Sequence, residues 1–129
     1  MLPALFCLVA SAAPTLPPGP PHAVRHLRAW WARLPPRVRI SDCTIRLAPR
    51  DERPSPFAVG WYDAETRTVS LLYDRSVDRP QYWRHLRPTF YHELGHHAHL
   101  SLFSDEERAR WQAVWEAHWH DLPSDYARR

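Results

Sequence analysis

A short run in the second half of the sequence, HELGHH, carries the side chains best suited to chemistry. His92 and His96 lie four residues apart, and Glu93 directly follows the first of them. On a helix, side chains four residues apart share one face, so both imidazoles can bind a single divalent ion. The carboxylate beside the first histidine can then accept a proton from a metal-bound water. The H-E-x-x-H spacing therefore predicts a Zn²⁺ site that hydrolyses peptide bonds, with Glu93 as the general base.

The residues around this motif favour a helix. Pro88 and Thr89 form an initiation signal, since proline is tolerated in a first helical turn and threonine is a good N-cap. Gly95 is a poor helix former, disfavoured by about 1 kcal/mol relative to Ala, so we expect another backbone or a ligand to need that space. An apolar stripe at helical spacing lies beside the histidines, at Phe90, Leu94 and Ala98.

A catalytic zinc ion usually has three protein ligands and one water. A third histidine six positions after the second, the metzincin pattern, is excluded because that residue is Leu102. The gluzincin alternative takes a carboxylate from a later helix, and Glu116 is the candidate within this chain, provided that its helix runs back along the first. Glu106 and Glu107 are expected to cap or solvate the start of that later helix instead. Weaker candidates are His118, His120 and Asp121.

The preceding residues predict an α+β fold class. Apolar residues at three- and four-residue spacing indicate an N-terminal helix over residues 22–34, which a Pro-Pro pair ends. Alternation over residues 38–47 then indicates half-buried strand segments. Residues 59–62 and 68–73 flank the turn-forming DAETR and predict a β-hairpin in a small antiparallel or mixed sheet. A turn over 80–86 precedes the helix with the histidines.

A further helix is expected after the histidine motif. Ser104 and Glu107 have the S-x-x-E spacing of a capping box, and Pro123 sets the latest end of the helix. We expect the aromatic stripe of this helix to be core packing against the metal helix and not a ligand platform. The stripe consists of Trp111, Val114, Trp115 and His118.

Composition limits the classes of function. At 129 residues, with 44% hydrophobic residues and seven Trp, the chain is sufficient for one packed domain. Its 17 basic residues are all Arg, spread from Arg25 onward without a block of five, and the net charge is only +3, so no nucleic-acid partner is expected. Cys7 and Cys43 match no zinc-ribbon or redox spacing.

Residues 1–21 differ from the rest, with an apolar run, then small residues, then a proline-rich linker. Leu2–Val9 resembles the apolar region of a secretory signal, and Ala10–Ala12 has the A-x-A form of a cleavage site, which favours export. No basic residue precedes the apolar run, so an uncleaved leader on a cytoplasmic protein is the alternative. The run is too short to span a bilayer, so we expect no stable membrane insertion and a folded domain over 22–129.

Three segments together resemble a known family: TFYHELGHH, a Trp-containing helix, and LPSDYARR. Over about residues 59–129 the chain resembles zincin metallopeptidases similar to the catalytic domain of anthrax lethal factor. The resemblance implies a zincin-like fold, zinc as the cofactor and a peptide or protein substrate. Residues 124–127 match the family's S-x-Y-A segment, which implies that Tyr126 stabilises the developing oxyanion. The family's third ligand is a Glu a few residues further on. Because the sequence stops at Arg129, we expect a C-terminally truncated copy, with Glu116 or a ligand from a partner or substrate as the alternatives.

Two other interpretations stay open. The ImmA/IrrE regulatory peptidases also carry a hairpin before an H-E-x-x-H helix, although their E-x-x-A-N and L-M-P segments have no match here. A catalytically incomplete zincin remnant, acting as a metal-binding or interaction module, is the other. For a peptidase, the hairpin over 59–73 would offer an edge strand that holds an extended peptide. His97 and His99 point away from the metal face and are expected to be surface residues or outer neighbours of the ligands.

Overall fold

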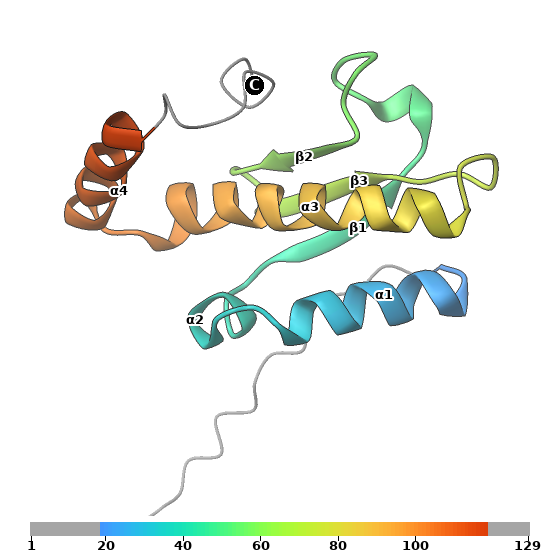
Figure 1. The fold of residues 1–129 in the computed structure, drawn as a ribbon, viewed down its shortest axis with the longest axis horizontal. Coiled ribbons are helices and arrows are strands. Elements are labelled where there is room, and N and C mark those ends of the chain that lie inside the picture. The colour runs from blue at the N-terminus through green and yellow to red at the C-terminus, as the bar shows by residue number, and fades with distance from the viewer. Residues whose placement is uncertain (1–18, 119–129) are drawn as a thin grey trace, which may run out of the picture.

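A computed structural model describes residues 19–118. The four α-helices are α1 (Pro21–Ala32), α2 (Pro36–Arg39), α3 (Pro80–His97) and α4 (Asp105–His118). The three strands are β1 (Thr44–Ala48), β2 (Gly60–Asp63) and β3 (Thr68–Leu72). A 3₁₀ turn, η1 (Arg50–Glu52), and a π-helical turn, η2 (Ala98–Leu102), complete the elements shown in Figure 1. The described part of the chain is therefore α+β, as predicted.

The strands form one mixed sheet in the order β1–β3–β2. β1 runs parallel to β3, with Ile45 opposite Val69, whereas β2 runs antiparallel to β3, with Tyr62 opposite the same Val69. The central strand β3 is therefore buried between two neighbours, and β2 lies at an edge of the sheet. The predicted hairpin is confirmed, with both strands within one residue of their expected bounds.

The hairpin turn is formed by the polar residues that predicted it. One carboxylate oxygen of Asp63 accepts hydrogen bonds from the backbone N–H groups of Glu65 and Thr66, at 2.9 and 3.3 Å. Arg67 then takes the left-handed conformation, with φ of 51°, that completes the reversal of the chain. These local interactions fix which face of β2 meets the core.

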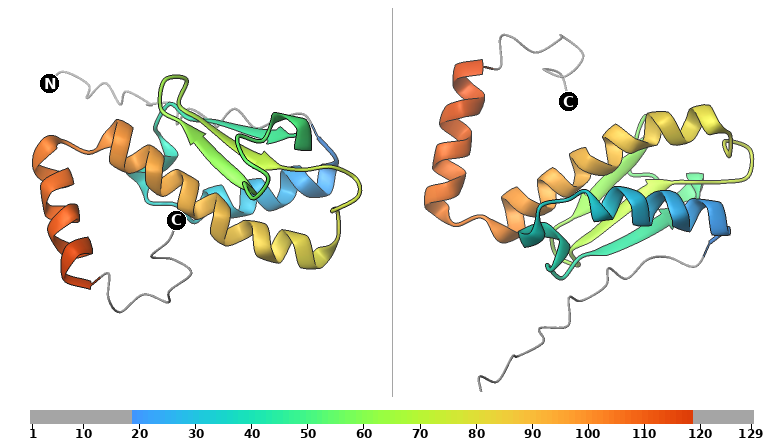
Figure 2. Two further views of the ribbon diagram at one scale, coloured as in Figure 1. Left: turned by 90° about the horizontal axis from the view of Figure 1, so that it is seen from above. Right: turned by 60° about the horizontal axis from the view of Figure 1, so that its bottom comes forward.

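The core lies between the sheet and two helices, α1 and α3 (Figures 1 and 2). The rings of Trp30 on α1 and Phe90 on α3 lie 5.4 Å apart, and the Tyr91 hydroxyl donates to the backbone carbonyl of Trp30 at 3.2 Å. Burying each large apolar side chain contributes about 1.5–3 kcal/mol, so this cluster is what holds α3 in place. Its members include Leu27, Trp31, Ile45, Val69, Leu71, Leu86, Phe90 and Leu94.

Two of the expected boundaries are wrong, and proline explains both. The strand expected from residue 38 begins only at Thr44, because residues 36–39 form the helix α2, where proline in the first helical position presets the backbone for a helix. α3 begins at Pro80, well before the expected start, so that Pro88 lies inside it. Pro88 removes the helical partner of the Arg84 carbonyl, but both residues are exposed, and water can replace that hydrogen bond.

α4 begins with the capping box that the sequence predicted. The Glu107 carboxylate accepts a hydrogen bond from the backbone N–H of Ser104 at 2.7 Å, and the Ser104 hydroxyl accepts one from the N–H of Glu107 at 3.2 Å. The expected core role of the aromatic stripe is wrong for Trp111 and Val114, which are 42% and 61% exposed. After η2 the chain turns, and α4 extends beyond the end of α3 without running back along it (Figures 1 and 2).

The described residues begin at residue 19. Cys7 and all but the last three residues of the predicted leader therefore lie outside them. Within residues 19–118, every helix falls short of the length or the apolar character that crossing a membrane requires. Cys43 is a buried free thiol, and burial raises its pKa to about 12. It is therefore protonated and unreactive at neutral pH.

Candidate metal centre

α3 brings His92 and His96 together on its solvent-facing side. Their Nε2 atoms lie 3.1 Å apart, and the ring centroids are 4.7 Å apart with the ring planes perpendicular. Both side chains are exposed. At this separation one Nε2 can donate a hydrogen bond to the other. The two ring nitrogens therefore face each other, and the pair is formed by these two side chains alone. The structure thus gives the pair the convergence that the four-residue spacing predicted.

Glu93 lies on the inner side of the same turn, with only 7% of its surface exposed. Among the described residues, no group hydrogen-bonds its carboxyl, and burial alone raises its pKa to about 7. The charged form loses hydration and gains no protein partner in return. Its carboxyl nevertheless lies within 4.8 Å of a nitrogen of each histidine. A buried acid is thus placed beside the pair with its hydrogen-bonding capacity unused.

The histidine pair fits a zinc ion in both chemistry and spacing. Zinc–nitrogen bonds of about 2.0–2.1 Å at tetrahedral angles separate two ligand nitrogens by about 3.3 Å. The 3.1 Å between the two Nε2 atoms is close to that value. A ligand imidazole must be neutral, and the pKa of His96 is lowered, first by burial and then by the neighbouring His92 and His99.

Two glycines near the motif have different surroundings. A Cβ on Gly60 of β2 would lie 2.6 Å from Cγ2 of Thr89 and 3.2 Å from Cγ of Glu93, so glycine is what allows β2 to approach α3 here. A Cβ on Gly95 would meet nothing within 4 Å. No described residue therefore needs the space that we expected Gly95 to leave for another backbone.

The outer edge of β2 is open to a further strand. In the described sheet β2 pairs only with β3, so its other edge carries backbone N–H and C=O groups without a strand partner. The close approach at Gly60 places this strand beside Glu93. The edge strand that the sequence predicted for the hairpin thus lies near the glutamate.

A buried histidine follows the metal pair directly. His97 is fully buried, so the expectation of a surface residue is wrong. Its Nε2 lies 2.9 Å from the Ser41 hydroxyl, and its Nδ1 lies 2.8 Å from the Tyr62 hydroxyl, which is 2.7 Å from the hydroxyl of Ser101. This network ties the loop after α2, the edge strand and η2 to the turn that carries His96. The sequence shows His97 only as the residue directly after the H-E-x-x-H pattern, and the partners that explain its burial are distant in the chain.

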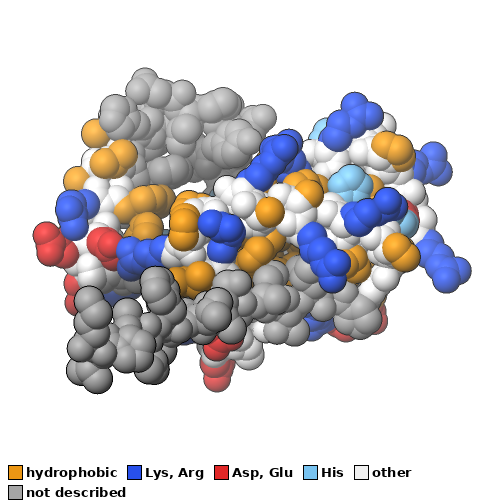
Figure 3. All heavy atoms as spheres, turned by 90° about the horizontal axis from the view of Figure 1, so that it is seen from below, with side chains coloured by type: hydrophobic (Ala, Val, Ile, Leu, Met, Phe, Trp, Pro, Cys, Tyr) orange, Lys and Arg blue, Asp and Glu red, His pale blue; other side chains and the backbone are white. Residues whose placement is uncertain are grey.

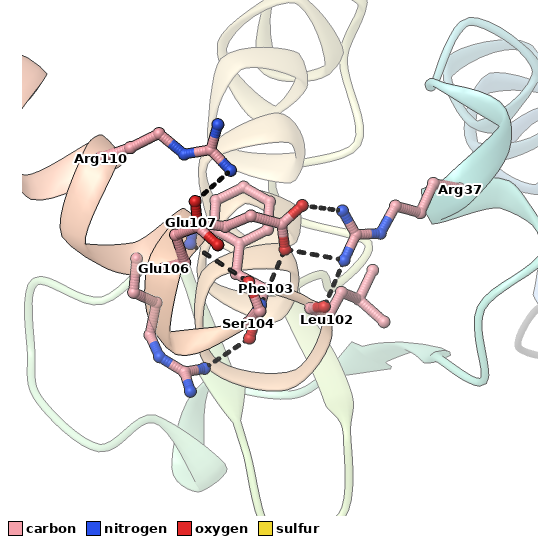
Figure 4. Close-up of polar contacts among 8 residues, drawn as sticks. Arg37, Leu102, Phe103, Ser104, Glu106, Glu107 and Arg110 are labelled. Atoms are coloured by element: carbon pink, nitrogen blue, oxygen red, sulfur yellow. Dashed lines mark hydrogen bonds and ion pairs between the residues drawn. The ribbon is translucent and has the colours of Figure 1, made fainter.

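Two of the carboxylates considered as ligands are engaged at the start of α4 (Figure 4). The guanidinium of Arg37 donates to both carboxylate oxygens of Glu107, at 2.6 and 3.0 Å, and to the backbone carbonyl of Leu102 at 2.5 Å. Glu106 pairs with Arg110 at 3.7 Å. Glu107 therefore caps α4 and ties it to α2, whereas Glu106 is a solvated residue of its first turn, in agreement with the roles predicted for the two.

Glu116, the candidate within the chain for the third ligand, is exposed on α4, and its carboxylate accepts a hydrogen bond from Gln112 at 2.8 Å. The structure does not group Glu116 with the histidine pair. In residues 19–118, the one cluster of three or more possible ligands is His92, Glu93 and His96. Tyr126, the predicted oxyanion stabiliser, lies outside the described residues, as do the weaker candidates His120 and Asp121.

Comparisons with protein families, with curated proteins and with solved structures found no match for this chain. The likeness to the lethal-factor-like zincins therefore depends on the sequence segments alone. Support for a function comes from the geometry of the site itself.

Proposed function

We propose that the chain is a zinc-dependent metallopeptidase in which His92 and His96 hold the ion and Glu93 is the general base. One observation carries the proposal. Two exposed imidazole nitrogens converge to 3.1 Å beside a carboxyl that is 7% exposed and has no hydrogen-bond partner among the described residues. Partial burial penalises the charged form of this carboxyl, although solvent still reaches its oxygens, since the fully buried side-chain atom without a partner among the described residues is Nε of Arg39. A bound ion and its water would remove that penalty.

Zinc bound at this pair would act as a Lewis acid and lower the pKa of a coordinated water to about 7. Glu93, fixed on the inner side of the helix, would take a proton from the attacking water and deliver it to the leaving amine. A nearby cation would also lower the pKa of this carboxyl, which burial alone raises to about 7.

A peptide substrate is supported by the open edge of β2. Backbone pairing with an edge strand holds an extended chain regardless of its side chains. Because Gly60 brings β2 against Glu93, a chain paired there would present its amide bonds near the base. The lethal-factor-like sequence segments support the same substrate class.

A metal-binding module without catalysis is the second candidate, and one observation favours it. The described residues offer the ion only two histidines and Glu93, and Glu116 is hydrogen-bonded elsewhere. If Glu93 itself became the third ligand, it would no longer be free to act as a base.

Zinc content and proteolysis of the full chain separate these possibilities. We expect about one zinc per wild-type chain, lost in His96→Ala and kept in His85→Ala, a matched exposed histidine on the same helix. Glu93→Gln should keep its zinc and lose about 10²–10⁴-fold in cleavage of a fluorogenic casein substrate. A wild-type chain that binds zinc but never cleaves would favour the module, and equal zinc content in His96→Ala and His85→Ala would reject the site.

A further inference from the structure

A second site lies at the other end of α3, where a groove of about 650 Å³ opens between α1 and the first turns of α3. Its lining includes His26, Asp78, Trp83 and three arginines, of which Arg84 and Arg87 lie on α3. Figure 3 shows Arg and His side chains gathered at this end of the molecule. At 1.5 Å per residue along the helix axis, Arg84 is about 12 Å and Arg87 about 8 Å from His92, the nearer of the two histidines. The groove lining contains neither histidine of the metal pair nor Glu93, so the groove is a different site.

The groove is positively charged because its three arginines outnumber its one acidic residue, Asp78. The carboxylate of Asp78 accepts hydrogen bonds from the Trp83 indole N–H and the Tyr73 hydroxyl, both at 2.8 Å, and contacts His22 at 2.7 Å. These partners lower the pKa of Asp78, with the Trp83 hydrogen bond the largest cause. Asp78 is thereby paired with these three side chains and forms no ion pair with the arginines of the groove.

The three arginines of the groove, Arg79, Arg84 and Arg87, are exposed. Within residues 19–118 no carboxylate lies within ion-pair distance of any of them, whereas Arg37, Arg46 and Arg50 each have one. The first turn of α3 contains no acidic residue, and the carboxylate of Asp78, just before the N-cap, is the one anion near this helix end in the groove lining. Guanidinium groups bind phosphate oxygens in pairs of parallel hydrogen bonds, which makes a phosphate group the anion best matched to this lining.

The groove also has an aromatic wall. The exposed ring of His26 stacks on Trp83, with centroids 4.9 Å apart and planes within 14° of parallel, and Trp30 lies 5.7 Å from the same His26 ring. A planar ring on a ligand could extend this stack. The volume is within the range of about 300–1,000 Å³ typical of small-molecule sites and is larger than a phosphate group alone requires.

We propose that this groove binds a small phosphorylated compound with a planar ring, of the nucleoside monophosphate class. Arg84 and Arg87 hold the phosphate, and the His26–Trp83 stack receives the ring. The site is independent of the metal centre, and its occupancy does not require catalysis there.

Calorimetric titration of the full chain with adenosine monophosphate, adenosine and inorganic phosphate tests the proposal. We expect adenosine monophosphate to bind more tightly than either of the other two. The Arg84→Gln/Arg87→Gln variant should bind it about tenfold or more weakly, since charge-assisted hydrogen bonds are lost. Arg25→Gln/Arg28→Gln, a pair with the same spacing on the exposed side of α1, should bind it as the wild type does.

The ring and the metal centre are tested separately. His26→Ala should reduce the affinity for adenosine monophosphate and leave that for inorganic phosphate unchanged. Binding should persist in His92→Ala/His96→Ala, which separates this proposal from that of the peptidase. Equal affinity for inorganic phosphate and adenosine monophosphate, or equal weakening in the two arginine variants, would overturn it.

Discussion

The last two turns of α3 have an inner and an outer face that differ in how their polar groups are satisfied. On the inner face, His97 is fully buried and both ring nitrogens contact protein hydroxyls. On the outer face, His92 and His96 are exposed and contact each other through nitrogens 3.1 Å apart. The two kinds of histidine are adjacent in the chain, yet only His97 has both ring nitrogens hydrogen-bonded to residues from other parts of the fold.

This difference indicates which residues serve folding and which are available to a ligand. A buried polar group must find its partners inside the protein, so His97 is tied to stability. An exposed pair contributes little to folding, so its two nitrogens are available to the ion that we propose. Glu93 lies between the two cases, since it is buried like His97 but lacks a partner as the outer pair does.

The largest expected effect on stability comes from replacing the histidine on the inner face, compared with the same replacement on the outer face. His97→Ala removes a buried ring and leaves the hydroxyls of Ser41 and Tyr62 without their partner, so we expect a loss of about 2–4 kcal/mol in the free energy of unfolding. His96→Ala, in zinc-free buffer, should change it by no more than about 0.5 kcal/mol. Urea denaturation followed by circular dichroism measures both, and equal losses would contradict the contrast between the faces.

A smaller loss is expected where β2 meets the inner face. Gly60→Ala would bring a Cβ to 2.6 Å from Cγ2 of Thr89, a branched side chain on a helix that cannot easily move. We expect a loss of about 1–3 kcal/mol in the free energy of unfolding, typical of overpacking. The same urea titration measures it, and an unchanged midpoint would show that β2 does not pack closely against α3.

On the outer face, replacing a glycine by alanine should raise the stability instead of lowering it. Gly95→Ala places a methyl group where nothing lies within 4 Å, in the interior of a helix. We expect a gain of about 0.5–1 kcal/mol in stability, because alanine loses less backbone entropy than glycine. Zinc content should not change. A loss of zinc with retained stability would indicate that the ion's surroundings, and not the helix, need the glycine.

The smallest effect concerns α4, which is anchored by surface charge and not by burial. Hydrogen bonds from Arg37, and then from the backbone of Ser104, lower the pKa of Glu107 to about 2. Its unfolded value is about 4.3. The folded pKa is the lower one, so this contribution to stability is present above about pH 4.3 and is lost as the pH falls toward 2. The stability difference between wild type and Glu107→Gln should therefore shrink over that interval in urea titrations, and a constant difference would argue against the ion pair.

The parts of the structure that short-range patterns determine could be predicted from the sequence. The histidine spacing fixes a common helix face, the polar DAETR segment fixes the hairpin turn through Asp63, and Ser104 with Glu107 fixes the start of α4. Each of these depends on residues at most a few positions apart. Helical and strand periodicities act at the same range, which is why the α1 helix and the two hairpin strands agree closely with their predicted bounds.

The features that depend on distant contacts could not be predicted in this way. His97 looked like a surface residue because its partners, Ser41 and Tyr62, are 56 and 35 residues away in the chain. Pro88 looked like a helix start because the exposure of its turn, which makes it tolerable inside α3, is set by the fold. The stripe with Trp111 looked like core because its pattern does not say that α4 turns away from the body.

The hydroxyl chain around His97 can run in only one direction. The Ser41 hydroxyl lies 2.5 Å from the carbonyl of Val38, which can only accept, so that hydroxyl must donate there. The proton between Ser41 and His97 therefore belongs to Nε2, and Nδ1 must accept from the phenol of Tyr62. The carbonyl of Val38, at one end of this series of hydrogen bonds, therefore selects a single neutral tautomer of His97. Nitrogen NMR of His97 would show it as two sharply distinct ring resonances, whereas a solvent-exchanging imidazole gives averaged ones.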